Sequence, residues 1–96
     1  MIKFLIIYYR NMSRYVYGGI DYTEHLICPI AKIVFTDPVA ASDGHTYEKS
    51  ALEQFLAQPT EPLSPKTGEL LDRTVIIPNL YIAGFLKKVK RVDCSY

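Results

Sequence analysis

The chain has 96 residues, which is enough for one compact domain and too few for two separate cores. Apolar residues make up 49% and charged residues 22%, and this soluble-like balance argues against a disordered tail, a collagen-like fibre or a coiled coil. Eleven basic against ten acidic residues give a net charge of +1, which supplies no strong field toward nucleic acid or an anionic membrane.

Cysteine usage and hydropathy indicate the compartment. The two cysteines, Cys28 and Cys94, form no CxxC pair, so a disulfide-dense secreted scaffold and a four-cysteine zinc module are both excluded. The longest apolar run, residues 4–9, has six residues, whereas a membrane span needs about 18 or more. We therefore expect no signal peptide or membrane span and a cytoplasmic or nuclear location, in the host cytosol if the protein is exported by a bacterium or a virus.

The first segment differs from the rest of the chain. Residues 1–24 hold five of the eight tyrosines and end soon after Gly18-Gly19. Their apolar residues follow neither a strand nor a helix period. We interpret residues 1–24 as an N-terminal extension outside the core, residues 25–90 as the folded domain and residues 91–96 as a C-terminal tail.

A hairpin and a helix are expected in the middle of the chain. Short strands at residues 39–42 and 45–47 flank Asp43-Gly44, a pair that favours a type I′ turn. Apolar residues share one face of a predicted helix at residues 47–58, for which Thr46 is the candidate N-cap. Pro59 forces residue 58 out of helical geometry and ends this helix.

A third strand and a second helix are expected near the C-terminus. The strand is predicted at residues 74–77. Asn79 is a good N-cap for a helix that runs through Val89, and the basic run at residues 87–91 favours the C-terminus of that helix. Residues 27–38 and 59–72 remain as irregular loops, and loops of this length in so small a domain need to be held in place.

Zinc is the usual way to hold such loops, but the ligand spacing does not fit. The chain's four histidines and cysteines are His25, Cys28, His45 and Cys94. They lack the paired spacing of closed tetrahedral sites. We therefore expect a buried thiol at Cys28, an imidazole at the hairpin tip at His45, and neither a metal nor another cofactor.

No catalytic constellation is evident either. His25 lies three residues before Cys28, but no third group is evident that would orient such a pair, and the chain contains no P-loop, GxGxxG or HExxH motif. Glu48 and Glu53 would point in different directions on a helix, so we interpret both as solvated. The basic run has no interleaved aromatic residues, which disfavours nucleic-acid binding.

Six short motifs occur in order between residues 26 and 89. They are Ile27-Cys28-Pro29-Ile30, Asp37-Pro38-Val39, Asp43-Gly44-His45-Thr46-Tyr47-Glu48, Leu52-Glu53-Gln54-Phe55-Leu56, Ser64-Pro65-Lys66-Thr67 and Ile77-Pro78-Asn79-Leu80. Each is weak alone, but together the chain resembles the U-box family of ubiquitin ligases. The resemblance implies a zinc-free, RING-like α+β fold with a short three-stranded antiparallel sheet, a central helix, two cross-braced loops and a C-terminal helix.

The resemblance also implies that polar side chains replace zinc as cross-braces between the loops. Polar residues suited to this lie in or beside the loops and the hairpin: Asp37, Ser42, Asp43, Thr46, Glu48, Ser64, Lys66 and Thr67. Each of them could instead cap backbone groups locally, as turn residues often do. The sequence leaves both interpretations open.

The resemblance further implies a ligase without a covalent intermediate, which docks a ubiquitin-charged conjugating enzyme and promotes attack by a substrate lysine. The implied docking residues are Ile30, Lys32, Phe55 and Pro65, with Lys66 beside them. Ile30 and Phe55 could instead be core contacts, and Pro65 could only stiffen its loop.

Two positions depart from the family pattern. Lys32 stands where many members carry an apolar or aromatic residue. Gly68 stands where many active members carry a basic residue, usually Arg, that bridges ubiquitin and the conjugating enzyme. A non-catalytic module that binds a protein partner is therefore the alternative function, and whether the chain forms a homodimer is left open.

Overall fold

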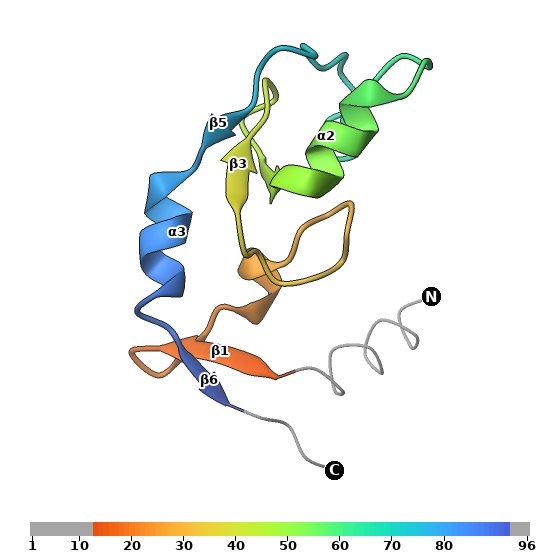
Figure 1. The fold of residues 1–96 in the computed structure, drawn as a ribbon. Coiled ribbons are helices and arrows are strands. Elements are labelled where there is room, and N and C mark those ends of the chain that lie inside the picture. Colours follow the sequence, from red (N-terminus) through yellow and green to blue (C-terminus); the bar gives the residue numbers. More distant parts are fainter. Residues whose placement is uncertain (1–12, 93–96) are drawn as a thin grey trace, which may run out of the picture.

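The computed structural model describes residues 13–92, which fold into two small sheets and two α-helices (Figure 1). The α+β class predicted from the sequence is confirmed. In chain order the elements are β1 (Arg14–Tyr17), β2 (Ile20–Asp21), the 3₁₀ helix η1 (Thr23–Leu26), β3 (Pro38–Ala40), β4 (Thr46–Glu48), α2 (Lys49–Ala57), β5 (Ile77–Pro78), α3 (Leu80–Leu86) and β6 (Lys90–Val92).

The first sheet is antiparallel with the order β4-β3-β5. The hairpin between β3 and β4 is present, but the predicted type I′ turn is wrong, because that turn needs positive φ at both central residues and only Gly44 has it, at 81°. The Gly44 N–H donates to the Ala41 carbonyl and the Ala41 N–H to the His45 carbonyl, both at 3.0 Å. The connection is therefore a three-residue loop that closes on a left-handed glycine.

Helix α2 starts later than the sequence predicted. Thr46 is not its N-cap, because Thr46 and Tyr47 pair with β3 as part of β4. Glu48 occupies the cap position in extended geometry, and its side chain does not cap the helix. The end is as predicted, since Gln58 is extended, with ψ of 148° before Pro59.

Helix α3 has the predicted cap and is shorter than predicted. The Asn79 side chain accepts a hydrogen bond of 3.1 Å from the Ile82 N–H. The helix ends at Leu86, whereas the sequence predicted helix through Val89. The strand before it is also displaced, because β5 is Ile77–Pro78 and residues 74–76 lie outside it.

A second sheet, with the order β2-β1-β6, was not predicted. Arg14 pairs with Val92 and Tyr15 with Arg91, which joins residues from the two ends of the described chain. Tyr17 and Tyr22 make edge-to-face contacts with Phe85 of α3. These contacts connect this sheet region to the helix. The predicted border after residue 24 falls within η1, and the predicted border after residue 90 falls within β6.

The core lies between the first sheet, α2 and both irregular segments. We call residues 27–37 loop one and residues 58–76 loop two. Loop one contributes Cys28 and Phe35 to the buried cluster, and loop two contributes Leu71. The remaining buried members are Val39, Ala41, Tyr47, Leu52 and Leu56. Neither helix in residues 13–92 has the length and apolar character that a membrane crossing requires.

Candidate functional site

Loop one folds back on itself through main-chain bonds. Ile27 and Val34 form an isolated antiparallel bridge. Inside it, the Cys28 N–H donates to the Ile33 carbonyl at 2.8 Å, and the Lys32 N–H donates to the Cys28 carbonyl at 2.9 Å. The bonds enclose a compact tip of residues 28–33.

Loop two repeats the same pattern 36 positions later. Leu63 and Leu70 form its bridge. The Ser64 N–H donates to the Glu69 carbonyl at 2.7 Å, and the Gly68 N–H donates to the Ser64 carbonyl at 2.9 Å. The residue at the fifth position of each tip has positive φ, 60° at Lys32 and 78° at Gly68. The two loops therefore present tips of equivalent geometry.

A polar side chain fills the inside of each tip. The Cys28 Sγ accepts the Ala31 N–H at 3.4 Å and the Glu48 N–H at 3.2 Å. The Ser64 Oγ accepts the N–H groups of Lys66 and Thr67, each at 3.0 Å. Cys28 is fully buried, which confirms the predicted buried thiol.

Loop two is tied to the hairpin by a cluster around Asp43. The Asp43 carboxylate accepts the Ser64 hydroxyl at 2.5 Å, the Tyr47 hydroxyl at 2.6 Å and the His45 N–H at 2.9 Å. Burial alone would raise the pKa of Asp43, but these hydrogen bonds outweigh it and hold that pKa below its ordinary value. Burial and the neighbouring carboxylate raise the pKa of Tyr47 to about 12, so the phenol stays protonated as a donor.

Loop one is tied down by Glu48. One carboxylate oxygen accepts the N–H groups of Thr36 and Asp37 at 2.9 and 3.1 Å, and the other accepts the Thr36 hydroxyl. Burial would raise the pKa of Glu48, yet the bonds from Thr36 and Asp37 lower it. The prediction that Glu48 is solvated is wrong, because it is 6% exposed and anchors the loop.

Further bonds hold the rest of the frame. The Ser42 Oγ accepts the Asp72 N–H at 2.8 Å, and the Asn79 amide donates to the Thr46 hydroxyl at 2.7 Å. The Arg73 guanidinium donates to the carbonyls that end α2 and follow it, those of Leu56, Gln58 and Thr60.

Thr36 and Arg73 are among the anchors that sequence reasoning missed. Neither stands in a recognisable motif, and each reaches its partner only through the tertiary fold. Of the eight predicted polar residues, five make long-range braces with their side chains: Ser42, Asp43, Thr46, Glu48 and Ser64. Thr67 bonds locally to the Glu69 N–H, whereas Asp37 and Lys66 join these networks through their main-chain N–H groups.

Metal-ligating side chains do not gather at the loops. Among residues 13–92, no group of three or more His, Cys, Asp or Glu side chains could hold a metal ion. Cys94, which the sequence analysis counted as a potential ligand, lies outside the described residues.

The implied docking residues divide into two kinds. Ile30 of loop one and Phe55 of α2 are half-buried, and both pack against the core cluster with part of each side chain accessible. Lys32, Pro65 and Lys66 are exposed at the two loop tips. The core contacts of Ile30 and Phe55 thus coexist with a surface that a partner could reach.

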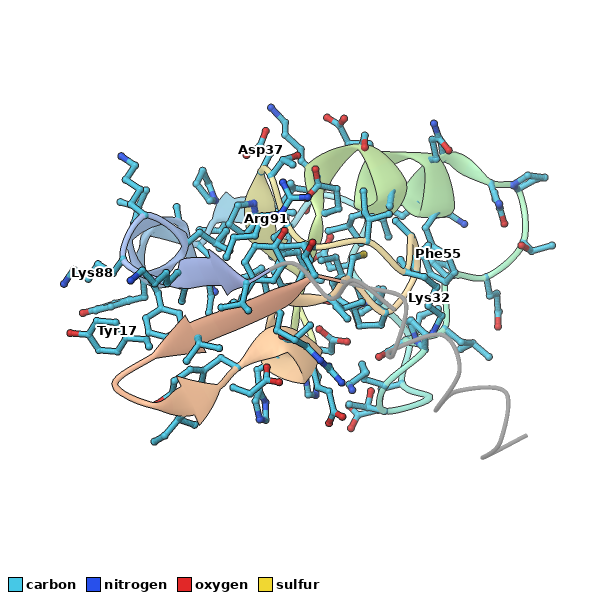
Figure 2. The ribbon with its side chains drawn as sticks, turned by 90° about the horizontal axis from the view of Figure 1, so that it is seen from below. Tyr17, Lys32, Asp37, Phe55, Lys88 and Arg91 are labelled. Carbon is cyan, nitrogen blue, oxygen red and sulfur yellow. The ribbon has the colours of Figure 1, made fainter. Side chains whose placement is uncertain are left out.

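Figure 2 shows Lys32 and Phe55 on one side of the molecule, with Tyr17 and Lys88 on the other. A polar pocket of about 280 Å³ lies where both loops meet the hairpin, lined among others by Pro29, His45 and Lys66. Of the implied docking residues, Lys66 lines this pocket, whereas Ile30 and Phe55 do not.

Comparison with known proteins gives a consistent family. Residues 23–90 match the U-box domain. The chain is 41% identical over 56 residues to the WD repeat, SAM and U-box domain-containing protein 1 of Homo sapiens, which covers 58% of this chain and 12% of that protein. It is 34% identical over 73 residues to the U-box domain-containing protein 37 of Arabidopsis thaliana, which covers 76% of this chain and 18% of that protein. The chain therefore spans less than a fifth of the length of these relatives.

Proposed function

The chain belongs to the U-box family, whose members are generally ubiquitin-ligase modules, and we propose that it binds a ubiquitin-charged conjugating enzyme and promotes transfer of ubiquitin to a substrate lysine. The observation that supports this proposal is the pair of equivalent loop tips, each held by hydrogen bonds, together with the half-buried apolar side chains of Ile30 in loop one and Phe55 in α2.

This role requires rigidity more than chemistry. A ligase that positions a carrier and restricts its bound ubiquitin accelerates transfer by lowering the entropic cost of reaching the reactive geometry. Such a ligase needs no nucleophile or general base of its own. The Asp43 and Glu48 networks supply the required stiffness. Three bonds to Glu48 fix loop one to the hairpin, and the Ser64 hydroxyl fixes loop two to Asp43, which Tyr47 and His45 hold in place from within the hairpin.

The proposed docking surface has an apolar centre and a cationic rim. Ile30 and Phe55 form the centre, Pro65 extends it onto loop two, and Lys32 and Lys66 stand at its edge. Interfaces of this design concentrate their binding energy in a few central anchors. Ile30 is the anchor that we expect to matter most.

Single-turnover discharge of ubiquitin from a panel of conjugating enzymes tests the proposal. Replacing Ile30→Ala should weaken carrier binding by about 1–3 kcal/mol, which is roughly a 5- to 150-fold rise in Kd. Ile20→Ala is the matched control, because Ile20 is 56% exposed on β2 of the second sheet, outside the proposed docking surface. Equal discharge by wild type and Ile30→Ala with every carrier would refute the proposed docking surface.

The second candidate is a non-catalytic module that binds a protein partner through the same surface. Gly68 favours it, because glycine offers no side-chain donor at the position where many active members carry a basic residue. Carrier binding without any accelerated discharge would support this second function over the first.

A further inference from the structure

Strand β6 forms one edge of the second sheet. The order of that sheet is β2-β1-β6, and among residues 13–92 β6 pairs with β1 alone. Every residue of β6 is exposed. Alternate residues of an antiparallel strand direct their N–H and C=O groups to opposite sides. The edge of β6 that faces away from β1 therefore presents main-chain groups to which a further strand can bind.

This edge carries positive charge. Residues 85–92 contain four basic residues and no acidic residue. Lys87, Lys88 and Lys90 are exposed, and within the described residues 13–92 none of these three ammonium groups has a carboxylate within ion-pair distance. The fourth base, Arg91, donates to the Ser13 hydroxyl oxygen at 3.1 Å. The three lysines therefore supply the charge that is open to a partner.

An apolar side chain stands beside that charge. Alternate residues of a strand point to the same face of the sheet, so Lys90 and Val92 share one face of β6. Val92 is 47% exposed. The edge thus offers an ammonium group and an apolar side chain two residues apart on one face.

An acidic, extended segment of a partner protein fits this edge. A strand added along β6 gains main-chain hydrogen bonds and places its own side chains opposite those of β6. Opposite charges at such cross-strand positions stabilise the pairing, and like charges weaken it. A carboxylate opposite Lys90 and an apolar side chain opposite Val92 meet both requirements, while Lys87 and Lys88 attract further carboxylates from a longer range.

Other occupants fit the edge less well. A second copy of β6 would bring two sets of lysines to one seam, and lysines on edge strands keep such copies apart. Residues 1–12 contain two basic residues and no acidic residue, so that segment has the same sign of charge as the edge. Nucleic acid carries the right charge, but its phosphate backbone lacks the alternating N–H and C=O groups that pair with a strand edge.

We propose that β6 is a docking edge for partner proteins that expose an acidic, extended segment with a carboxylate and an apolar residue at alternate positions. Figure 1 shows β6 at the end of the molecule away from α2, and the edge contains none of the residues proposed to dock the conjugating enzyme. Binding at β6 therefore does not rest on the proposed function. Where both hold, a partner on β6 and a carrier at the loop tips bind the same molecule at the same time.

Fluorescence anisotropy with the full chain tests the proposal, using a labelled synthetic peptide that repeats Glu-Thr-Val-Thr. Wild type should bind this acidic peptide, and a version with lysine in place of glutamate should bind about 10-fold more weakly or worse. A version with proline in place of threonine should also bind more weakly, because proline has no N–H to donate. Amide hydrogen exchange in β6 should slow when the acidic peptide is added.

Charge-reversal variants locate the binding. Lys90→Glu should raise the Kd of the acidic peptide about 10-fold. Lys88→Glu should raise it about 3-fold, and it leaves the pairing of β6 with β1 in place because Lys88 lies outside the strand. Lys49→Glu makes the same charge change at the start of α2 and should leave Kd unchanged. Ile30→Ala should bind the peptide as wild type does, which separates this edge from the docking surface for conjugating enzymes.

Several results would overturn the proposal. Absence of binding, equal binding of the acidic and lysine peptides, or an unchanged Kd for both Lys90→Glu and Lys88→Glu would exclude β6 as a site for acidic segments. Tighter binding of a thymidine oligonucleotide than of the acidic peptide would assign the charge to nucleic acid. Slow exchange at the outer edge of β6 before peptide is added would assign that edge to a second copy if the chain sediments as a dimer, and to its own terminal residues if it sediments as a monomer. None of these results changes ubiquitin discharge, so the proposed function would stand.

Discussion

Cys28 and Ser64 occupy equivalent positions in two loops that share one hydrogen-bonding pattern, although 36 residues separate them. Each is buried, and each accepts main-chain N–H groups inside its loop tip. Their second tasks differ. Cys28 also accepts the Glu48 N–H, whereas Ser64 donates its hydroxyl to Asp43. One sulfur and one oxygen therefore connect the two tips to the same hairpin, Cys28 at β4 and Ser64 at the turn between β3 and β4.

Ser64→Ala should destabilise the fold more than its small change in volume suggests. The substitution leaves two N–H groups of loop two without their acceptor and removes one of the two donors to the Asp43 Oδ2, which keeps the Tyr47 hydroxyl. Unsatisfied buried groups cost about 1–3 kcal/mol each. We expect a loss of at least 2 kcal/mol in urea unfolding, as an order-of-magnitude value from the same range. Ser50→Ala, exposed on α2, should be close to neutral. Similar stabilities for the two variants would contradict this role for Ser64.

Cys28→Ala and Cys28→Ser separate the size of the thiol from its role as acceptor. Alanine leaves the N–H groups of Ala31 and Glu48 unpaired, which should cost about 1–3 kcal/mol of unfolding free energy. Serine keeps an acceptor and should recover part of that loss. The recovery should be partial because hydrogen bonds to oxygen are shorter than those to sulfur, and the serine oxygen would lie too far from both N–H groups for its best geometry. A serine variant less stable than the alanine variant would show that packing dominates.

Acid should weaken the frame through Asp43 and Glu48. Both carboxyls have pKa values below their ordinary 3.8 and 4.5. A lowered pKa in the folded state adds stability that is complete above the ordinary value and is lost as the pH falls through the folded value. The urea concentration at the unfolding midpoint should therefore decrease once the pH is lowered below about 4.5, the ordinary pKa of Glu48. In Asp43→Asn and Glu48→Gln the urea midpoint should decrease less steeply with falling pH than in wild type. A variant with the wild-type pH dependence would show that the replaced carboxylate does not contribute to the acid sensitivity.

Gly68→Arg should fold and should increase ubiquitin discharge. The left-handed conformation of residue 68 costs a non-glycine residue about 1–2 kcal/mol, and an added Cβ meets no atom within 4 Å. Lys32 adopts the same conformation in loop one. The planar arginine fork can donate to two carbonyl groups at once, which lysine cannot. Single-turnover discharge measures the gain, with Gly68→Ala as the control for backbone strain, and a folded variant without any gain would favour the non-catalytic alternative.

Local signals in the sequence predicted the fold well where a neighbouring residue decides the structure. Pro59 ends α2 because of its own ring, and Asn79 caps α3 through a bond three residues away. Thr46 carried an equally good capping signal, but pairing with Ala40 placed it in β4. Sheet formation therefore prevailed over capping at that position.

The sequence could not predict the second sheet, because its strands are short and its pairing spans most of the chain. Lys90 and Arg91 suit the C-terminus of a helix equally well, yet they pair with Val16 and Tyr15. The docking residues depended on family resemblance, and their roles stay predictions. The strain at Lys32 had no sequence signal, because nothing nearby in the chain requires positive φ there.

The pairing of β1 with β6 places Arg14 directly opposite Val92, at the end of the molecule away from α2 (Figure 1). Cargo attached before β1 and cargo attached after β6 would consequently emerge side by side. A short linker between these two strands would permit circular permutation, with new termini opened at the exposed residues 59–61. In such a permuted chain, the positions of β1 and β6 would determine how far a fused substrate could reach toward the loop tips. The order of the segments along the sequence would not.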